Sequence, residues 1–420
     1  MFKRLACVAA ALLAAPAAAT GFAELPPAAA VAAFTAERGE APLWLRDGPD
    51  GPAVRRLNAT LRQAPLDGLA IGPRLAAASA AAVERARGGG AVERAEAERM
   101  LSAAWVMYVQ ALHWPTAGMI YADSSVAPKI PAPAAILAQL ASARSLAGHV
   151  ERVSAVNPLY ADLRAALAKE ADPQLRRTLQ ANLERARGLP AGGRYILVDL
   201  AAQQLWMMED GRPADSMKVV VGKAEMKTPL IAGTVRAATL NPYWNAPADL
   251  VRRSIAPAAA AGGAAYLQAK GYELLSGWQA DARQLSPAEV DWQAVADGRT
   301  EVRVRQKPGP GNMMGAVKFE FARAQGIYLH DTPDKSLFAR EVRTFSSGCI
   351  RLEDAARLGR WLVGRKPVAK EDVPEQVVNL PQAVPVYVTY LTARVEDGRV
   401  AVAADVYGLD GAAAQRLASR

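Results

Sequence analysis

Near residue 190 the sequence changes from a helical pattern to a strand pattern, and this change limits what the chain can fold into. Residues 40–190 are rich in Ala, Leu, Arg and Glu, and segments such as "AERMLSAAWVMYVQALH" space their apolar residues as one face of a helix does. Breakers such as "RGGGA" and "KIPAPA" separate these segments. The first part of the chain is therefore expected to be an α-helical module.

After "GLPAGGR", short apolar runs with strand character follow one another, among them "YILVDL" and "SMKVVVGK". Near the C-terminus "VPVYVTYLTARVEDGRVAVAADVYG" predicts two strands joined by a turn. Residues 248–303 are helical and Ala-rich again, which indicates an insertion. The predicted fold class is α+β, with a helical domain over 20–190 and a mostly β, sandwich-like domain over 191–410.

The first residues have the features of a secretory signal peptide. Lys3 and Arg4 precede an apolar stretch, and a small-residue cleavage site ends at Ala19. No later run reaches the ~18 apolar residues that a membrane-spanning helix needs. We therefore expect residues 1–19 to be removed and the rest of the chain to be extracytoplasmic, without a membrane span.

The composition favours some partners and argues against others. A formal charge of +9 suits an anionic neighbour such as cell-wall polymer or lipid head groups, although plain solubility explains it equally well. No pattern of stacked aromatic and Arg residues indicates nucleic acid. The chain has three histidines, no HExxH motif and no cysteine cluster, so a catalytic zinc site is poorly supported.

Cys349 is the only cysteine outside the first seven residues, and it lies in "TFSSGCIRLED". Without an intramolecular partner it is either a small apolar filler or a thiol kept for chemistry. Gly348 permits a tight turn, which would let backbone N–H groups near the cysteine face a developing oxyanion.

His330 is the histidine best suited to act with this thiol. It ends the strand-like run "GIYLHD", in which Tyr328 shares its face because strand side chains alternate. A neighbouring imidazole can take the proton of a thiol and so create a nucleophile that attacks a carbonyl. His113 and His149 lie in helical runs and are interpreted as structural or surface residues. The pattern indicates thiol–imidazole chemistry, with a filler cysteine as the alternative.

The segment "IYLHDTPDKSLFAREVRTFSSGCIRLED" resembles the active-site segment of L,D-transpeptidases, which crosslink bacterial peptidoglycan. "VVGKAEMKTP", "NPYWNAP" and "PGPGNMMGAVKFEF" resemble the strands and loops that lead into that site. The helical half is similar to the scaffold module of the large periplasmic branch of this family. Ser347 stands where most of the family has histidine, so His330 must be the sole base. The sequence leaves no room for the peptidoglycan-binding module of many large-branch members.

The resemblance implies a mechanism. Cys349 attacks the carbonyl of the third residue of a tetrapeptide stem, and His330 gives the proton that the departing D-alanine requires. An amine of a second stem then resolves the thioester into a 3→3 crosslink. Substrate or oxyanion contacts are expected from Ser346, Ser347, Gly348, Arg351 and Tyr328. For Arg351 a salt bridge with Glu353 or Asp354 is an equal alternative, and for Tyr328 a place in the core.

The resemblance also implies a setting. The helical insertion at about 248–303 resembles a cap over the cleft, which would exclude water from the thioester. No metal or organic cofactor is implied. The expected partners are donor and acceptor stem peptides in the periplasm, with peptidoglycan synthases as further candidates, and the family implies carbapenem sensitivity and a role in cell shape. The same acyl-enzyme resolved by water, a D-amino acid or a protein lysine stays open, as does a non-catalytic wall-binding protein.

Overall fold

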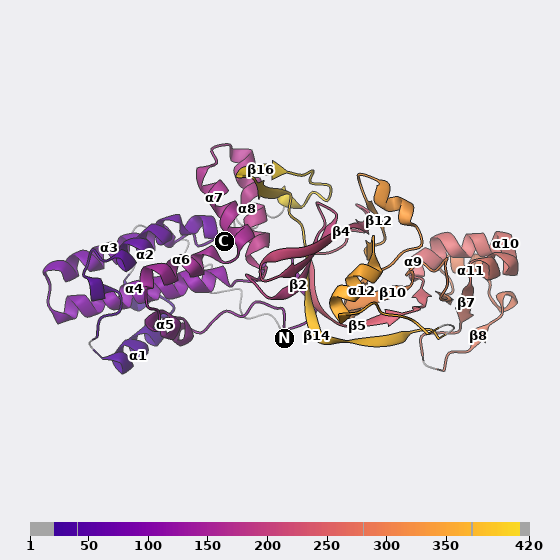
Figure 1. Cartoon of the computed structure of the whole chain (residues 1–420), viewed down its shortest axis with the longest axis horizontal. Coiled ribbons are helices and arrows are strands. Elements are labelled where there is room, and N and C mark those ends of the chain that lie inside the picture. Colours follow the sequence, from indigo (N-terminus) through magenta and orange to yellow (C-terminus); the bar gives the residue numbers. More distant parts are fainter. Residues whose placement is uncertain (1–20, 40, 280, 371–372, 412–420) are drawn as a thin grey trace. The chain divides into compact units, whose positions relative to one another are not determined.

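The structure is a computed structural model that describes residues 21–39, 41–279, 281–370 and 373–411 (Figure 1). The expected signal peptide lies outside these residues. Contacts divide the chain into two compact units, which we call the helical unit and the β-rich unit. The helical unit comprises the chain up to Met119, Ala127–Gly192 and the chain from Tyr390, and the β-rich unit comprises Ile120–Val126 and Gly193–Thr389.

The helical unit confirms the helical pattern of the first part of the chain. Its helices are α1 (Ala28–Arg38), α2 (Pro52–Gln63), α3 (Gly72–Gly88), α4 (Ala91–Leu112), α5 (Pro133–Ala141), α6 (Leu146–Ala155), α7 (Pro158–Lys169) and α8 (Pro173–Arg187). Proline opens several of them, where its missing N–H costs nothing. The side chains of Asn157 and Asp172 cap α7 and α8.

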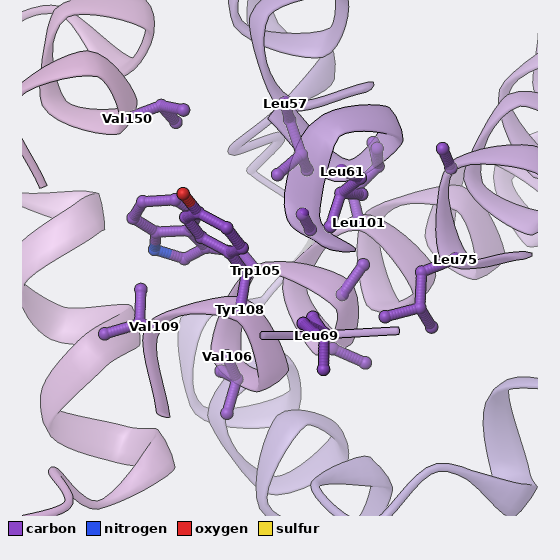
Figure 2. Packing of buried hydrophobic residues seen from close by; sticks show 14 of the residues in the cluster. Leu57, Leu61, Leu69, Leu75, Leu101, Trp105, Val106, Tyr108, Val109 and Val150 are labelled. Atoms are coloured by element: carbon purple, nitrogen blue, oxygen red, sulfur yellow. The ribbon is translucent and has the colours of Figure 1, made fainter. Parts of the chain in front are cut away.

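The core of the helical unit gathers around α4. The rings of Trp105 and Tyr108 stack at 5.9 Å between centroids, and both side chains are fully buried. Figure 2 shows leucines of α2, including Leu57 and Leu61, and Val150 of α6 around these rings. Each such buried side chain contributes roughly 1.5–3 kcal/mol, so packing holds these helices together more than their propensity does.

A buried carboxylate ties three parts of the helical unit together. Asp67 lies in the turn between α2 and α3, and its side chain is fully buried. It accepts hydrogen bonds from the hydroxyls of Tyr108 (3.0 Å) and Tyr160 (2.7 Å). Arg164 adds a two-pronged ion pair at 2.6 and 2.8 Å. Because Tyr108 belongs to α4 and Tyr160 and Arg164 belong to α7, this network fixes the turn, α4 and α7 relative to one another.

The main sheet of the β-rich unit closes on itself. In order it runs β1 (Ile120–Tyr121), β5 (Ile231–Leu240), β10 (Val317–Ala322), β11 (Ile327–His330), β13 (Ile350–Leu352), β4 (Arg212–Gly222), β3 (Gln204–Glu209), β2 (Arg194–Asp199) and β14 (Gln376–Thr389), with β12 (Thr344–Ser346) on β4. The long strand β14 pairs with both β2 and β5. The strands thus form a closed ring, because Val386, Tyr387 and Val388 of β14 pair with β2 on one side and with β5 on the other.

Two Asp-Gly turns join neighbouring strands, and the one near the C-terminus confirms the predicted turn. Asp210 and Gly211 both have positive φ and join β3 to β4, as a two-residue hairpin turn requires. Asp397 and Gly398 do the same for the hairpin of β15 (Ala393–Glu396) and β16 (Arg399–Val402). This hairpin belongs to the helical unit, whereas β1 belongs to the β-rich unit. A single boundary near residue 190 leaves out both exchanges, because contacts between segments far apart in the sequence decide them.

The insertion between β5 and β10 has a core of its own. It contains α9 (Ala248–Leu250), α10 (Ala256–Ala269) and α11 (Trp292–Ala296), visible beside β7 and β8 in Figure 1. It also contains a sheet in the order β6 (Trp244–Asn245), β9 (Arg303–Gln306), β7 (Tyr272–Leu275) and β8 (Gln284–Leu285). We call this insertion the cap. Its Ala-rich composition predicted helices alone, but the cap also contains a four-stranded sheet.

The remaining helix, α12 (Ala355–Val363), packs on β10 and β14. Across all the residues that the structure describes, no helix combines the length and the apolar character needed to cross a membrane.

Candidate active site

Two neighbouring strands bring the predicted site residues to one face of the sheet. β11 and β13 pair in parallel, with His330 opposite Arg351. Opposite residues share a face and alternate residues return to it, so Tyr328 and Cys349 lie on this face too. We call this side of β10, β11 and β13 the polar face. Cys349 is the diagonal neighbour of His330 across the two strands.

The strand on the other side of β11 adds charged residues to the polar face. Lys318 of β10 lies opposite His330, and Glu320 lies opposite Tyr328. The ammonium of Lys318 pairs with Glu320 at 3.2 Å and with Glu375 at 3.5 Å. His330 therefore has a cation in register on each side, and one of the two is balanced by carboxylates.

The opposite face of these strands is apolar. Phe319, Leu329 and Ile350 are fully buried there. Gly359 of α12 lies against the ring of Phe319, where an added Cβ would be 3.6 Å from it. Close packing on this side gives the polar face a rigid base, because packed side chains cannot shift without opening a void.

His330 is buried and electrically neutral at rest. Burial lowers the pKa of its imidazole to about 4, and the charge of Arg351 acts in the same direction. Its Nδ1 lies 2.5 Å from the carbonyl oxygen of Asp331. Because a carbonyl can only accept, Nδ1–H is the donor to Asp331 and Nε2 of the neutral ring carries the lone pair. The imidazole is thus held in the tautomer that can accept a proton.

Asp331 fixes the loops around this histidine. Its carboxylate accepts hydrogen bonds from the Ala316 N–H (2.9 Å) and from the ammonium of Lys335 (2.6 Å). Gly315 has φ +63°, and a Cβ on it would lie 2.5 Å from the Asp331 side chain. Only glycine therefore lets the 309–316 loop approach so closely.

Cys349 carries a protonated thiol at rest. Burial raises the pKa of the thiol, although the backbone N–H of Tyr328 and the charge of Arg351 counter that rise. The sulfur lies 3.5 Å from the carbonyl oxygen of Gly326. Within the described part of the chain, no hydrogen bond joins it to His330. The thiol must therefore turn away from Gly326 before the imidazole can accept its proton, and such tightening on ligand binding is common.

The turn before Cys349 is held by its own hydrogen bonds. Gly348 has φ +115°, in the region that side chains rarely adopt. Its N–H donates to the Ser346 hydroxyl (3.1 Å), and this hydroxyl donates to the Cys349 carbonyl (2.5 Å). Ser346 is buried and Ser347 is exposed. The Ser346 hydroxyl thus shapes the turn, and only Ser347 offers its side chain to solvent.

Thr228 is a site residue that the sequence did not reveal. Its hydroxyl donates to the Gly348 carbonyl (2.8 Å) and accepts from the Gly222 N–H (2.9 Å), and it is buried. Gly222 must lack a side chain, because a Cβ would lie 2.2 Å from the Met226 carbonyl. The loop after β4 therefore supports the nucleophile turn from behind. "GKAEMKT" carries no local signal for this role.

Arg351 keeps its guanidinium available. Among the residues that the structure describes, it makes no hydrogen bond or ion pair, so the alternative of a bridge to Glu353 or Asp354 is wrong. Glu353 instead accepts the Lys218 N–H (3.1 Å), and Asp354 caps α12. Burial lowers the pKa of Arg351. Such a partly buried cation favours binding of an anion.

The other histidines are structural, as predicted. His113 lies within hydrogen-bond distance of the Val109 carbonyl (2.9 Å), and His149 packs edge-on against Trp105. Tyr328, in contrast, is half-buried on the polar face rather than in the core. Over the described ranges, no group of three or more His, Cys, Asp or Glu side chains could hold a metal ion.

Comparisons with known proteins match both parts of the chain. Residues 193–374 match the YkuD L,D-transpeptidase catalytic domain, and residues 29–167 match a scaffold domain. A candidate L,D-transpeptidase of Haemophilus influenzae is 30% identical over 239 residues, which is 55% of this chain and 48% of that protein. The chain thus spans about half the length of the curated relative that it matches.

Two solved structures are also similar. An L,D-transpeptidase from Mycobacterium smegmatis has 14% identity and a TM-score of 0.24, over 48% of this chain and 60% of that one. The C442S mutant of an Enterococcus faecium L,D-transpeptidase has 14% identity and a TM-score of 0.22, over 48% of this chain and 52% of that one. Scores this low add nothing about the site. On the sequence matches, residues 193–374 form an L,D-transpeptidase catalytic domain of the YkuD family, joined in this chain to a scaffold domain.

Proposed function

We propose that this protein is a periplasmic, cysteine-dependent L,D-transpeptidase that links the third residues of two peptidoglycan stems. The observation that carries the proposal is the pairing of β11 with β13, which makes Cys349 the diagonal neighbour of His330. The tautomer of His330 supports it, because Nε2 is the nitrogen that has no proton. Nothing in this chemistry requires a metal.

The first half-reaction forms a thioester. The thiol of Cys349 turns toward His330, whose Nε2 takes its proton, and the sulfur attacks the carbonyl carbon of the third stem residue. The oxyanion that forms is stabilised by the N–H of Cys349, which the braced turn holds in place. The bond to D-alanine then breaks, and His330 gives its proton to the departing amine.

The second half-reaction consumes the thioester. An amine of an acceptor stem attacks the same carbonyl carbon, and Nε2 of His330 takes a proton from that amine. The carbon–sulfur bond breaks, and the proton returns to the sulfur of Cys349. A pKa of about 4 leaves the imidazole neutral at physiological pH, so it is in the form that can accept a proton.

The polar face also supplies contacts for the stem peptides. Arg351 binds a stem carboxylate, which its lack of a partner among the described residues supports. Tyr328 lines the donor site beside the sulfur, and Ser347 contacts the substrate from the exposed side of the turn. Ser346 and Gly348 act through the shape of the turn. The cap limits access of water to the thioester.

Product analysis tests the proposal against its alternatives. Purified protein is incubated with tetrapeptide muropeptides, and the products are separated by mass. We expect 3→3-linked dimers in excess over tripeptide monomers, with release of D-alanine. Tripeptides alone would indicate a carboxypeptidase, and no release of D-alanine would indicate a wall-binding protein without activity. An excess of a carbapenem should leave one covalent adduct on the peptide that contains Cys349.

A further inference from the structure

The cap sheet has a second face that its core does not use. Trp244, Tyr272, Leu274 and Val304 pack into the core of the cap. Residues that alternate with these point the other way. This other side, which we call the cap face, carries Asn245, Glu273, Arg303 and Arg305, with Asn245 and Glu273 both opposite Arg305.

A tryptophan stands exposed at one end of the cap face. Trp278 is 65% exposed, and the guanidinium of Arg303 lies 4.5 Å from the centroid of its ring. Arg303 is itself fixed, because it donates to the Asn245 side chain (2.8 Å) and to the Gly277 carbonyl (3.4 Å). Cation–π contact thus backs one side of the indole ring and leaves the ring broadly open to solvent.

A second ring is built in the same way. The guanidinium of Arg305 lies 4.0 Å from the centroid of the Tyr243 ring. Glu273 holds Arg305 at 2.7 Å and also pairs with Lys307 at 3.4 Å. Since Arg303 and Arg305 are alternate residues of one strand, the two arginines that back the rings stand roughly 7 Å apart.

The cap face continues from the polar face of the catalytic sheet. The carboxylate of Glu375 accepts the Tyr243 N–H at 2.8 Å and pairs with Lys318 at 3.5 Å. Lys318 lies opposite His330. Glu375 therefore connects the edge of the cap face to β10, the strand next to His330. A polymer could extend from one surface to the other.

We propose that the cap face binds the glycan chain of peptidoglycan, an inference that rests on the proposed function for its choice of polymer. An exposed ring offers a flat apolar surface to the C–H side of a sugar, and Tyr and Trp do so at a low cost in conformational entropy. Arg303 and Asn245 supply N–H donors for hydroxyl and acetamido groups. With Lys307 beside them, Arg303 and Arg305 outnumber the one carboxylate of the cap face, and this excess of positive charge suits a polymer whose stems carry carboxylates.

Binding to peptidoglycan with and without stems tests this proposal. The purified full chain is sedimented with insoluble peptidoglycan and with peptidoglycan from which an amidase has removed the stems. We expect wild-type protein to bind both, and Trp278→Ala to bind the stem-free glycan roughly three- to tenfold more weakly. Trp278→Phe, which keeps an apolar ring, should recover part of the loss. Binding to stem-free glycan should persist at about 0.5 M salt, because stacking is not screened.

The chain offers a matched control. Trp361 of α12 is also backed by an arginine, with Arg194 at 4.1 Å from its ring, but it lies outside the cap. Trp361→Ala should bind glycan as wild type does. Equal binding by Trp278→Ala and wild type would overturn the proposal, as would loss of wild-type binding when the stems are removed. Release of D-alanine from free tetrapeptide is measured separately, so failure of the proposed activity is distinguishable from failure of this surface.

Discussion

The burial of His330 should make the free energy of unfolding depend on pH. Its imidazole has a pKa of about 4 in the fold and about 6.5 when unfolded, so between these values the unfolded chain binds more protons. The free energy of unfolding should contain the full contribution of His330 above about pH 6.5 and lose it as the pH falls toward 4. From about pH 7 to pH 5 this loss should be about 2 kcal/mol.

Urea unfolding of His330→Gln at both pH values isolates this contribution. The variant should lose about 2 kcal/mol less than wild type between them. His113→Gln, which removes an exposed histidine, is the matched control and should keep the wild-type dependence. An equal loss in wild type and His330→Gln would contradict the burial of a neutral imidazole.

Single residues were predictable where the signal was local. The strand alternation of "GIYLHD" and the turn before Cys349 pointed to both proposed catalytic groups. Thr228 was not predictable, because its hydroxyl reaches a carbonyl that is 120 positions away. The place of Lys318 beside His330 depends on the register of β10 with β11, which no local pattern specifies.

At the scale of elements, Thr228 couples the loop after β4 to the nucleophile turn. Thr228→Val removes the hydroxyl and leaves the Gly348 carbonyl and the Gly222 N–H without their partner. Each unsatisfied buried group costs about 1–3 kcal/mol, so the melting temperature should fall. Misplacement of the turn should lower kcat on the order of 10- to 100-fold.

Thr228→Ser is the matched control, since it keeps the hydroxyl. It should retain kcat within about threefold of wild type, because the serine hydroxyl can still bond the Gly348 carbonyl and the Gly222 N–H. If Thr228→Val released D-alanine at the wild-type rate, the hydrogen bonds of the Thr228 hydroxyl would have no part in positioning Cys349.

The cap is an element that can be removed. Residues 247–303 can be replaced by a short glycine linker, because the pairing of β6 with β9 holds the two ends of this segment next to each other. Exposure of the thioester to water should then shift products from dimers toward tripeptides. Muropeptide analysis measures this ratio, with circular dichroism as the check on folding. An unchanged ratio would mean that the cap does not protect the thioester.

Helices and hairpins were predictable because they repeat a period or carry a turn signal. The Asp-Gly pairs marked both hairpins, and the apolar spacing marked α4. The strands of the cap were missed, because β7, β8 and β9 are only two to four residues long and interrupt an Ala-rich stretch. Closure of the main sheet was not predictable, because β14 pairs on both sides with strands far away in sequence.

At the scale of the whole molecule, the two units should unfold separately. Asp67→Ala removes the buried partner of Arg164 and leaves that cation without its carboxylate. Loss of one member of a buried pair costs about 3–5 kcal/mol, so the transition of the helical unit should move to lower temperature. Calorimetry of the full chain measures both transitions. Asp162→Ala, at an exposed position of α7, is the control. Equal shifts in both transitions would contradict two independent units.

The order of the two units followed from the change of pattern near residue 190. The sequence did not predict that β1 belongs to the β-rich unit or that the chain from Tyr390 belongs to the helical unit, because contacts between distant segments decide both. The proposed catalytic groups could be named from the sequence because they lie within 20 positions of one another.

The most direct test of the account is the mass of the protein during turnover. Wild-type protein mixed with tetrapeptide and quenched with acid should gain the mass of the stem without its D-alanine. Peptide mapping should place this acyl group on Cys349. Cys349→Ala and Cys349→Ser should gain no mass, because a hydroxyl beside one histidine is far harder to ionise than a thiol. An acyl group on another residue, or release of D-alanine by either variant at the wild-type rate, would contradict the account.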